Sequence, residues 1–190
     1  MSIARTFTAL TLFLAAGSAM AHGGHGGSFA AGVVHPFSGL DHMLAMLAVG
    51  LYAGRQEGAL RWALPAGFVG AMLLGAMLGA HGHSLPAIEG GVAASLLILG
   101  VMIAFVVRLP LAAALALIGT MAVFHGLAHQ AEMGAGSLAS YAAGFAIATA
   151  ALHLAGIVLA RWMPQSPTAQ ILKRALGGGI AATGLVLLGN

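Results

Sequence analysis

Residues 35–50 read HPFSGLDHMLAMLAVG, and this stretch changes character half-way along. Its second half is a continuous apolar run, as in a helix that enters a membrane. Its first half holds two histidines, a proline and Asp41, the only aspartate of the chain. Because an ionised side chain costs about 2.5–3.5 kcal/mol at the centre of a membrane helix, we expect these polar groups to have a function.

The composition around this stretch is that of an integral membrane protein. Of the 190 residues, 60% are hydrophobic and 6% are charged, whereas a soluble domain carries roughly 25% charged residues. The charged side chains are too few to cover the surface of a soluble fold, so we predict a single all-α domain in the lipid bilayer. The sequence pI near 10.2 does not indicate nucleic-acid binding, because the basic residues are scattered along the chain. The chain has no cysteine, which excludes disulfides and thiolate metal ligands.

Residues 1–21 have the pattern of a cleavable signal peptide. A short basic segment, MSIAR, precedes the apolar segment TFTALTLFLAA and the small residues of GSAMA. The apolar segment is too short to span about 30 Å of hydrocarbon, which disfavours the alternative of an uncleaved first membrane helix. We predict cleavage before His22, with cleavage after Ala19 as the alternative.

Residues 22–190 then hold six apolar segments, each close to the roughly 20 residues that a transmembrane helix needs. The predicted helices cover residues 31–53, 62–81, 87–107, 110–129, 137–160 and 172–189. Because the connections between them are short, we predict a six-helix transmembrane bundle whose function lies within the bundle.

The basic residues determine the predicted orientation. Beyond the signal peptide they all lie at the loops after the first, third and fifth helices: Arg55, Arg61, Arg108, Arg161, Lys173 and Arg174. The positive-inside rule makes these loops cytoplasmic. We therefore predict a multi-pass protein of the bacterial cytoplasmic (inner) membrane, with the mature N-terminus and the C-terminus in the periplasm.

Histidine is the main chemical resource of the chain, with nine copies against four acidic residues. In the predicted layout, eight of these nine histidines lie in the outer half of the membrane or outside it. This placement favours an outward-facing site that collects a cation. Imidazole and carboxylate ligands without thiolate suit Ni²⁺, Co²⁺, Zn²⁺ or Cu²⁺.

The first predicted helix carries His35, Asp41 and His42. The two histidines are seven residues apart, which would place them on one helical face about 10 Å from each other. Asp41 would point to a different face. One hypothesis is metal ligation by the imidazoles, with Asp41 as a direct ligand or as the partner that orients a ring. The alternative is that Asp41 accepts a hydrogen bond from an imidazole and only locks two helices together.

The fourth predicted helix ends in FHGLAHQAEMG, which contains His125, His129 and Glu132. The spacings of four and three residues place all three on one face if the helix continues that far. Two imidazoles and a carboxylate in this register are a known ligand set for divalent metals. The alternative is a packing role with ordinary hydrogen bonds.

Five other histidines are weaker candidates. His22 and His25 lie in the tail after the signal peptide and could bind metal there. His81 and His83, in HGHS, could bind metal loosely or form a polar cap at the interface. His153 lies deep in the fifth predicted helix, as a hydrogen-bonded interhelical residue or as a ligand on a transit path.

Two motifs resemble those of a known family. HPFSGLDHMLAMLAVG resembles the HPxxGxDHxxxMxxVG pattern of the HupE/UreJ family, and FHGLAHQAE resembles its second signature, FHGxAHGxE, with Gln130 in place of the glycine. The resemblance covers essentially the whole chain. It implies a permease or accessory protein that supplies nickel, or cobalt, to hydrogenase or urease. It also implies the functional positions His35, Asp41, His42, His125, His129 and Glu132.

We therefore predict a permease that brings Ni²⁺, or Co²⁺, from the periplasm into the cytoplasm for hydrogenase or urease maturation. The metal would be the transported ion and not a prosthetic group. The expected partners are the lipid bilayer, the divalent ion and downstream metallochaperones, and no enzymatic activity or nucleic-acid partner is expected. Two alternatives are an intramembrane metal-dependent hydrolase and a metal-binding accessory protein that does not transport.

Overall fold

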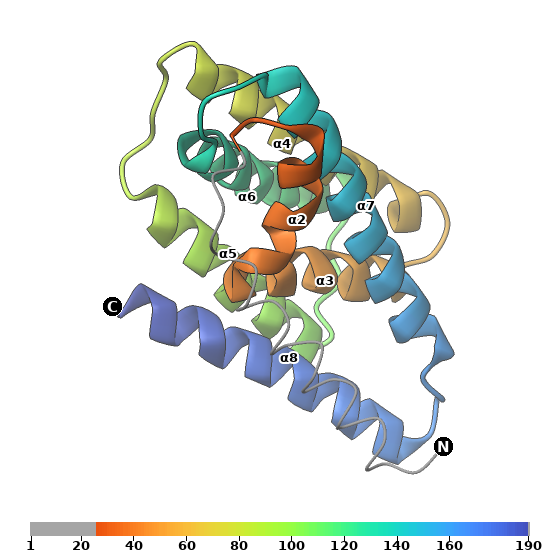
Figure 1. The fold of residues 1–190 in the computed structure, drawn as a ribbon. Coiled ribbons are helices and arrows are strands. Elements are labelled where there is room, and N and C mark those ends of the chain that lie inside the picture. The colour runs from red at the N-terminus through yellow and green to blue at the C-terminus, as the bar shows by residue number, and fades with distance from the viewer. Residues whose placement is uncertain (1–25, 190) are drawn as a thin grey trace.

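The structure is a computed structural model that describes residues 26–189, and this part of the chain is helical, as predicted. Figure 1 shows the helices packed around one another in a bundle. They are α2 (Phe29–Ser38), α3 (Leu40–Gly54), α4 (Leu60–Ala80), α5 (Ile88–Ala104), α6 (Leu111–Glu132), α7 (Leu138–Trp162) and α8 (Pro167–Leu188). The predicted signal peptide, His22 and His25 lie outside the described residues.

The first predicted helix, over residues 31–53, is two helices and not one. The chain leaves helical geometry at Gly39, where φ is −106° and ψ is 125°, so that α2 ends and α3 begins there. The side chain of Asp41 stabilises the new start, because its Oδ1 accepts a hydrogen bond from the backbone N–H of His42 at 2.8 Å. A Cβ atom on residue 39 would lie 2.6 Å from the same Oδ1, so glycine leaves room for this cap.

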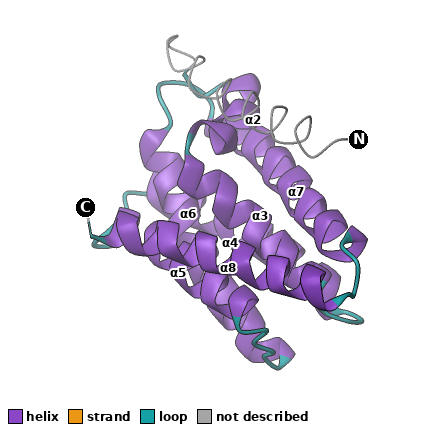
Figure 2. Cartoon of the chain, turned by 90° about the horizontal axis from the view of Figure 1, so that it is seen from below, coloured by secondary structure: helices purple, strands orange, loops and turns teal. Residues whose placement is uncertain are grey.

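The remaining helices pack around α3, mostly in pairs. Contacts join α4 to α6, α5 to α8, and α7 to both α2 and α3. Figure 1 shows α8 along the outside of the bundle next to α5, and the view from below in Figure 2 agrees. At such contacts glycine lets backbones approach closely, since a Cβ on Gly75 of α4 would collide with the backbone of Val123 in α6.

Among residues 26–189, four helices are long and apolar enough to cross a membrane: α4, α6, α7 and α8. Two further apolar helices are shorter, α3 with 15 residues and α5 with 17 residues. A helix rises 1.5 Å per residue, so these two reach only about 22–26 Å against about 30 Å of hydrocarbon. The helical architecture and apolar spans are those of a membrane protein, while the count of six crossings and the orientation stay predictions.

Candidate metal-binding site

Four histidines from three helices lie next to one another in a row. His35 of α2 is followed by His129 of α6, with ring centroids 4.9 Å apart. His42 of α3 comes next at 4.7 Å from His129, and His125 of α6 lies 5.2 Å beyond His42. Two sequence motifs far apart in the chain, residues 35–50 and 124–132, thus contribute to one histidine row.

The break at Gly39 corrects the expected spacing of the first motif. On one continuous helix His35 and His42 would lie about 10 Å apart. Their ring centroids are 6.0 Å apart, because the chain turns between them and α3 starts in a new direction. Both rings therefore lie against His129 of α6, and His42 also lies against His125.

Asp41 also points differently from the prediction, toward His42 and not to a separate face. Its Oδ1 lies 3.0 Å from Nδ1 of His42. An ionised carboxylate only accepts hydrogen bonds, so Nδ1 carries a proton, and in the neutral ring Nε2 of His42 keeps its lone pair. This Nε2 is buried and has no hydrogen-bond partner among the described residues. Asp41 therefore holds the His42 ring in one tautomer, in which Nε2 is available as a ligand atom.

Ser95 of α5 likewise fixes the tautomer of His125, a role that the sequence did not predict. The Ser95 hydroxyl donates to the carbonyl of Val92 at 2.6 Å. Its oxygen then accepts from Nε2 of His125 at 2.9 Å. Nδ1 of His125 is consequently the lone-pair nitrogen, and it too is buried without a partner in the described part of the chain. A serine inside the apolar run of α5 was the available signal, but its partner lies 30 residues away.

His129 and His153 are buried, and within residues 26–189 neither ring nitrogen of either residue has a hydrogen-bond partner. This disfavours the expectation that His153 is a hydrogen-bonded interhelical residue. Phe68 of α4 joins the two regions, with its ring centroid 5.5 Å from His125 and 5.1 Å from His153. His153 thus lies one aromatic ring beyond the inner end of the histidine row.

The outer end of the row is a contact between a carboxylate and an imidazole. Helix α6 continues to Glu132, as its predicted role required, and Glu132 Oε2 lies 2.8 Å from Nε2 of His35. These side chains are 42% and 19% exposed, whereas His125 and His129 are fully buried. The row therefore runs from an accessible carboxylate inward to buried imidazoles with free nitrogen atoms.

The site holds suitable donors but is not a closed chelate. Among the described residues, no three His, Asp or Glu side chains are arranged to hold one ion together. A structural site would need about four such ligands around the metal. The row fits an ion that is passed between ligands better than an ion that is kept.

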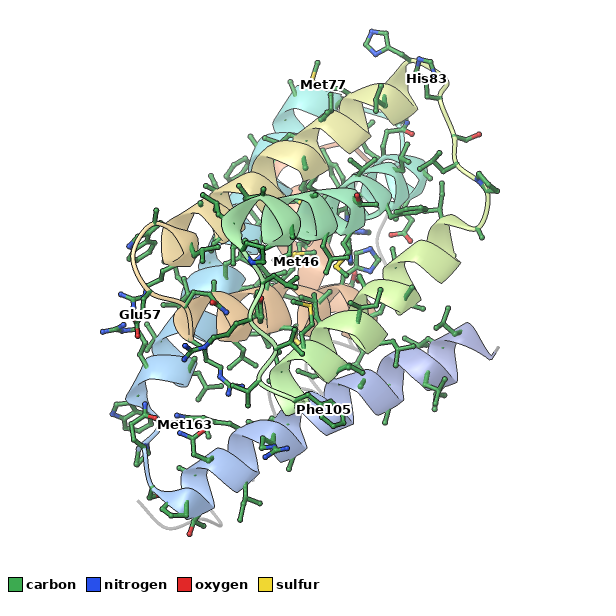
Figure 3. The ribbon with its side chains drawn as sticks, turned by 180° about the vertical axis from the view of Figure 1, so that it is seen from behind. Met46, Glu57, Met77, His83, Phe105 and Met163 are labelled. Carbon is green, nitrogen blue, oxygen red and sulfur yellow. The ribbon has the colours of Figure 1, made fainter. Side chains whose placement is uncertain are left out.

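HGHS lies apart from this row. His81 caps the end of α4 by a contact of 2.8 Å between its Nδ1 and the carbonyl of Met77, and both histidines are exposed. Figure 3 shows His83 projecting from the tip of α4, while Met46 lies in the interior of the bundle. Of the two readings of HGHS, the structure favours the polar cap.

Comparison with known proteins agrees with the two motifs. The sequence profile described as "HupE / UreJ protein" matches residues 10–187. The chain belongs to the HupE/UreJ family. It is also 40% identical over 190 residues to Protein HupE of Rhizobium leguminosarum bv. viciae, and the match covers 99% of each chain. No solved structure matches the chain.

Membership of the HupE/UreJ family applies to nearly the whole chain, including both motifs of the histidine row. At the one departure, Gln130, the side chain packs against Gly79 of α4, since a Cβ on residue 79 would lie 2.7 Å from its Oε1. The family glycine is thus replaced by a side chain that contacts the neighbouring helix and leaves both α6 histidines in the row.

Proposed function

We propose that this protein is a permease for Ni²⁺, with Co²⁺ as the alternative ion, that moves the metal from the periplasm into the cytoplasm. The observation that carries the proposal is a set of buried imidazole nitrogens in His42, His125 and His129 that have no hydrogen-bond partner among the described residues. Burying polar atoms unpaired costs free energy, and a passing cation would recover that cost by accepting their lone pairs. Neutral imidazole is a common ligand of Ni²⁺ and Co²⁺.

The path would start at Glu132 and His35. A carboxylate at the exposed edge attracts a hydrated dication, and the adjacent imidazole replaces part of its water. His129, His42 and His125 follow at centroid spacings of 4.7–5.2 Å, close enough for one ligand to be released as the next binds. His153 would receive the ion beyond Phe68.

Asp41 and Ser95 would act as positioning residues in this path. Each holds one ring nitrogen of a histidine and so presents the other nitrogen to the ion. Asp41 also places a negative charge beside the dication. The expected client, hydrogenase or urease, would receive the metal on the inner side through a metallochaperone.

The test is uptake of radioactive Ni²⁺ into proteoliposomes that contain the purified protein. His42→Ala removes a central ligand and should abolish saturable uptake. His83→Ala is the matched control, because it removes an exposed histidine outside the row and should transport like the unmodified protein.

A binding measurement on the same preparations separates the alternatives. Ni²⁺ binding that His42→Ala abolishes, without any uptake by the unmodified protein, would replace the permease by a metal-binding accessory protein. Equal uptake by His42→Ala and the unmodified protein would contradict the proposed path.

A further inference from the structure

A polar cavity of about 480 Å³ lies among the ends of α3, α4, α5, α7 and α8, away from the histidine row. Its lining is strongly basic. The basic side chains are Arg55, Arg61, Arg108, Arg161 and Lys173, and the acidic one is Glu57. Five positive charges against one negative charge give an excess of four. Figure 3 shows Glu57 and Met163 on this side of the molecule and His83 on the other.

Carboxylates do not neutralise these charges. Within residues 26–189, no arginine or lysine forms an ion pair, because the carboxylate contacts there are made by histidines. Backbone carbonyls instead accept hydrogen bonds from several of the cationic groups. Arg61 donates to Gln56 O at 2.9 Å, and Lys173 Nζ donates to two carbonyls that follow α7, both at 3.2 Å. Such bonds fix the position of a cation and leave its charge in place.

The gathered charges repel one another. Burial lowers the pKa of Arg55, and the positive charges of Arg108 and Arg174 lower it further. Lys173 is only 6% exposed, and Nε of Arg61 is buried without a hydrogen-bond partner in the described residues. A bound anion would relieve this repulsion and supply the missing acceptor.

Two simpler explanations account for part of the cluster. The positive-inside rule explains why basic residues lie at this end, and Arg55 also caps α5 through a 2.8 Å hydrogen bond to Ile103 O. Neither explains why five basic side chains surround one hollow. Arg174 shows the contrast, because it lies at the same end, caps α5 through Ala104 O at 2.9 Å, and does not line the cavity.

We propose that this cavity binds a phosphate-bearing anion, supplied by the headgroup of an anionic phospholipid. Arginine and lysine are the usual partners of phosphate, and the volume is within the range of about 300–1,000 Å³ of small-ligand pockets. By the charge rule the cavity lies at the cytoplasmic interface, where basic pockets between helices bind anionic headgroups. The proposal does not depend on metal transport.

The test measures lipid binding to the purified full-length protein in detergent, with phosphatidylglycerol as the probe and phosphatidylcholine as the neutral comparison. Arg108→Gln and Arg61→Gln should each weaken phosphatidylglycerol binding about fivefold, the contribution of one basic side chain near an anionic lipid. Arg108 is exposed, so its replacement should leave folding intact, which circular dichroism checks. Arg174→Gln is the matched control, because it removes one positive charge at the same end from a residue that does not line the cavity, so it should weaken binding less than Arg108→Gln.

Inorganic phosphate is added as a competitor, to distinguish a site for the lipid headgroup from a site for any phosphate group. Phosphatidylglycerol binding that phosphate does not displace would support the lipid headgroup, and displacement would support a site for phosphate groups in general. The proposal is overturned if both lipids bind equally. It is also overturned if Arg174→Gln weakens binding as much as Arg108→Gln, because the effect would then be that of surface charge.

Discussion

At the scale of single residues, the histidine row depends on neighbours that fix which ring nitrogen is free. Asp41 holds Nδ1 of His42, and Ser95 holds Nε2 of His125. In the proposed path the two histidines would therefore present different nitrogens to the ion. Asp41 is next to its histidine in the sequence and could be suspected from it, but Ser95 comes from another helix.

Replacing Ser95 tests this positioning role. In Ser95→Ala, Nε2 of His125 loses its acceptor and the ring can adopt either tautomer. Loss of such a partner typically costs about 10–100-fold in metal affinity, so we expect Ni²⁺ binding to weaken to that extent. Equilibrium dialysis with Ni²⁺ measures the change.

Ser95→Thr keeps the hydroxyl and should restore most of the affinity. A purely structural role of Ser95 would lower thermal stability and leave the Ni²⁺ affinity of the folded protein unchanged, which would contradict the prediction.

At the scale of elements, small residues determine which helices can pack together. Along the contact between α5 and α8, a Cβ on Gly100 would meet the backbone of Ala181, with its Cα at 2.7 Å. Gly177 and Gly184 of α8 make the reciprocal close approaches to α5. The frequent glycines of the sequence thus act in close helix packing, as is typical of membrane bundles.

Gly100→Ala should separate α5 from α8. Forcing a methyl group against a backbone costs about 1–3 kcal/mol, and a lower melting temperature in detergent measures the loss. Gly178→Ala is the control, because a Cβ there meets nothing within 4 Å and should leave the melting temperature the same or higher. Equal destabilisation by both substitutions would contradict the packing role.

At the scale of the whole molecule, two polar regions lie at opposite ends of α3. His42 is in its first turn, and Arg55 follows its last residue at the basic cavity. The histidine row gathers imidazole and carboxylate side chains, while the cavity gathers basic side chains. The predicted orientation would place the row toward the periplasm and the cavity toward the cytoplasm.

Single cysteines in this cysteine-free chain test the orientation. Ser84→Cys, between α4 and α5, should react with a membrane-impermeant maleimide in intact spheroplasts. Ala59→Cys, at the start of α4, should react only after the membrane is opened. Labelling in the reverse pattern would place the histidine row on the cytoplasmic side.

The sequence by itself determined the membrane class, the helical architecture, the candidate ligands and the family, because composition, apolar run length and motif spacing are properties of the chain alone. It also predicted that His125, His129 and Glu132 share the end of one helix, since three- and four-residue spacing is local.

Only the tertiary structure decided how these residues meet. The helix breaks at Gly39, and the side chain of Asp41 accepts a hydrogen bond from a backbone N–H in the first turn of α3, which the apolar pattern of residues 31–53 conceals. The partner of His125, the ring of Phe68 beside His153 and the closure of five basic side chains around one cavity all join residues from different helices. Such contacts depend on which glycine-lined faces pack together, and that choice is made by the assembled bundle and not by any one segment.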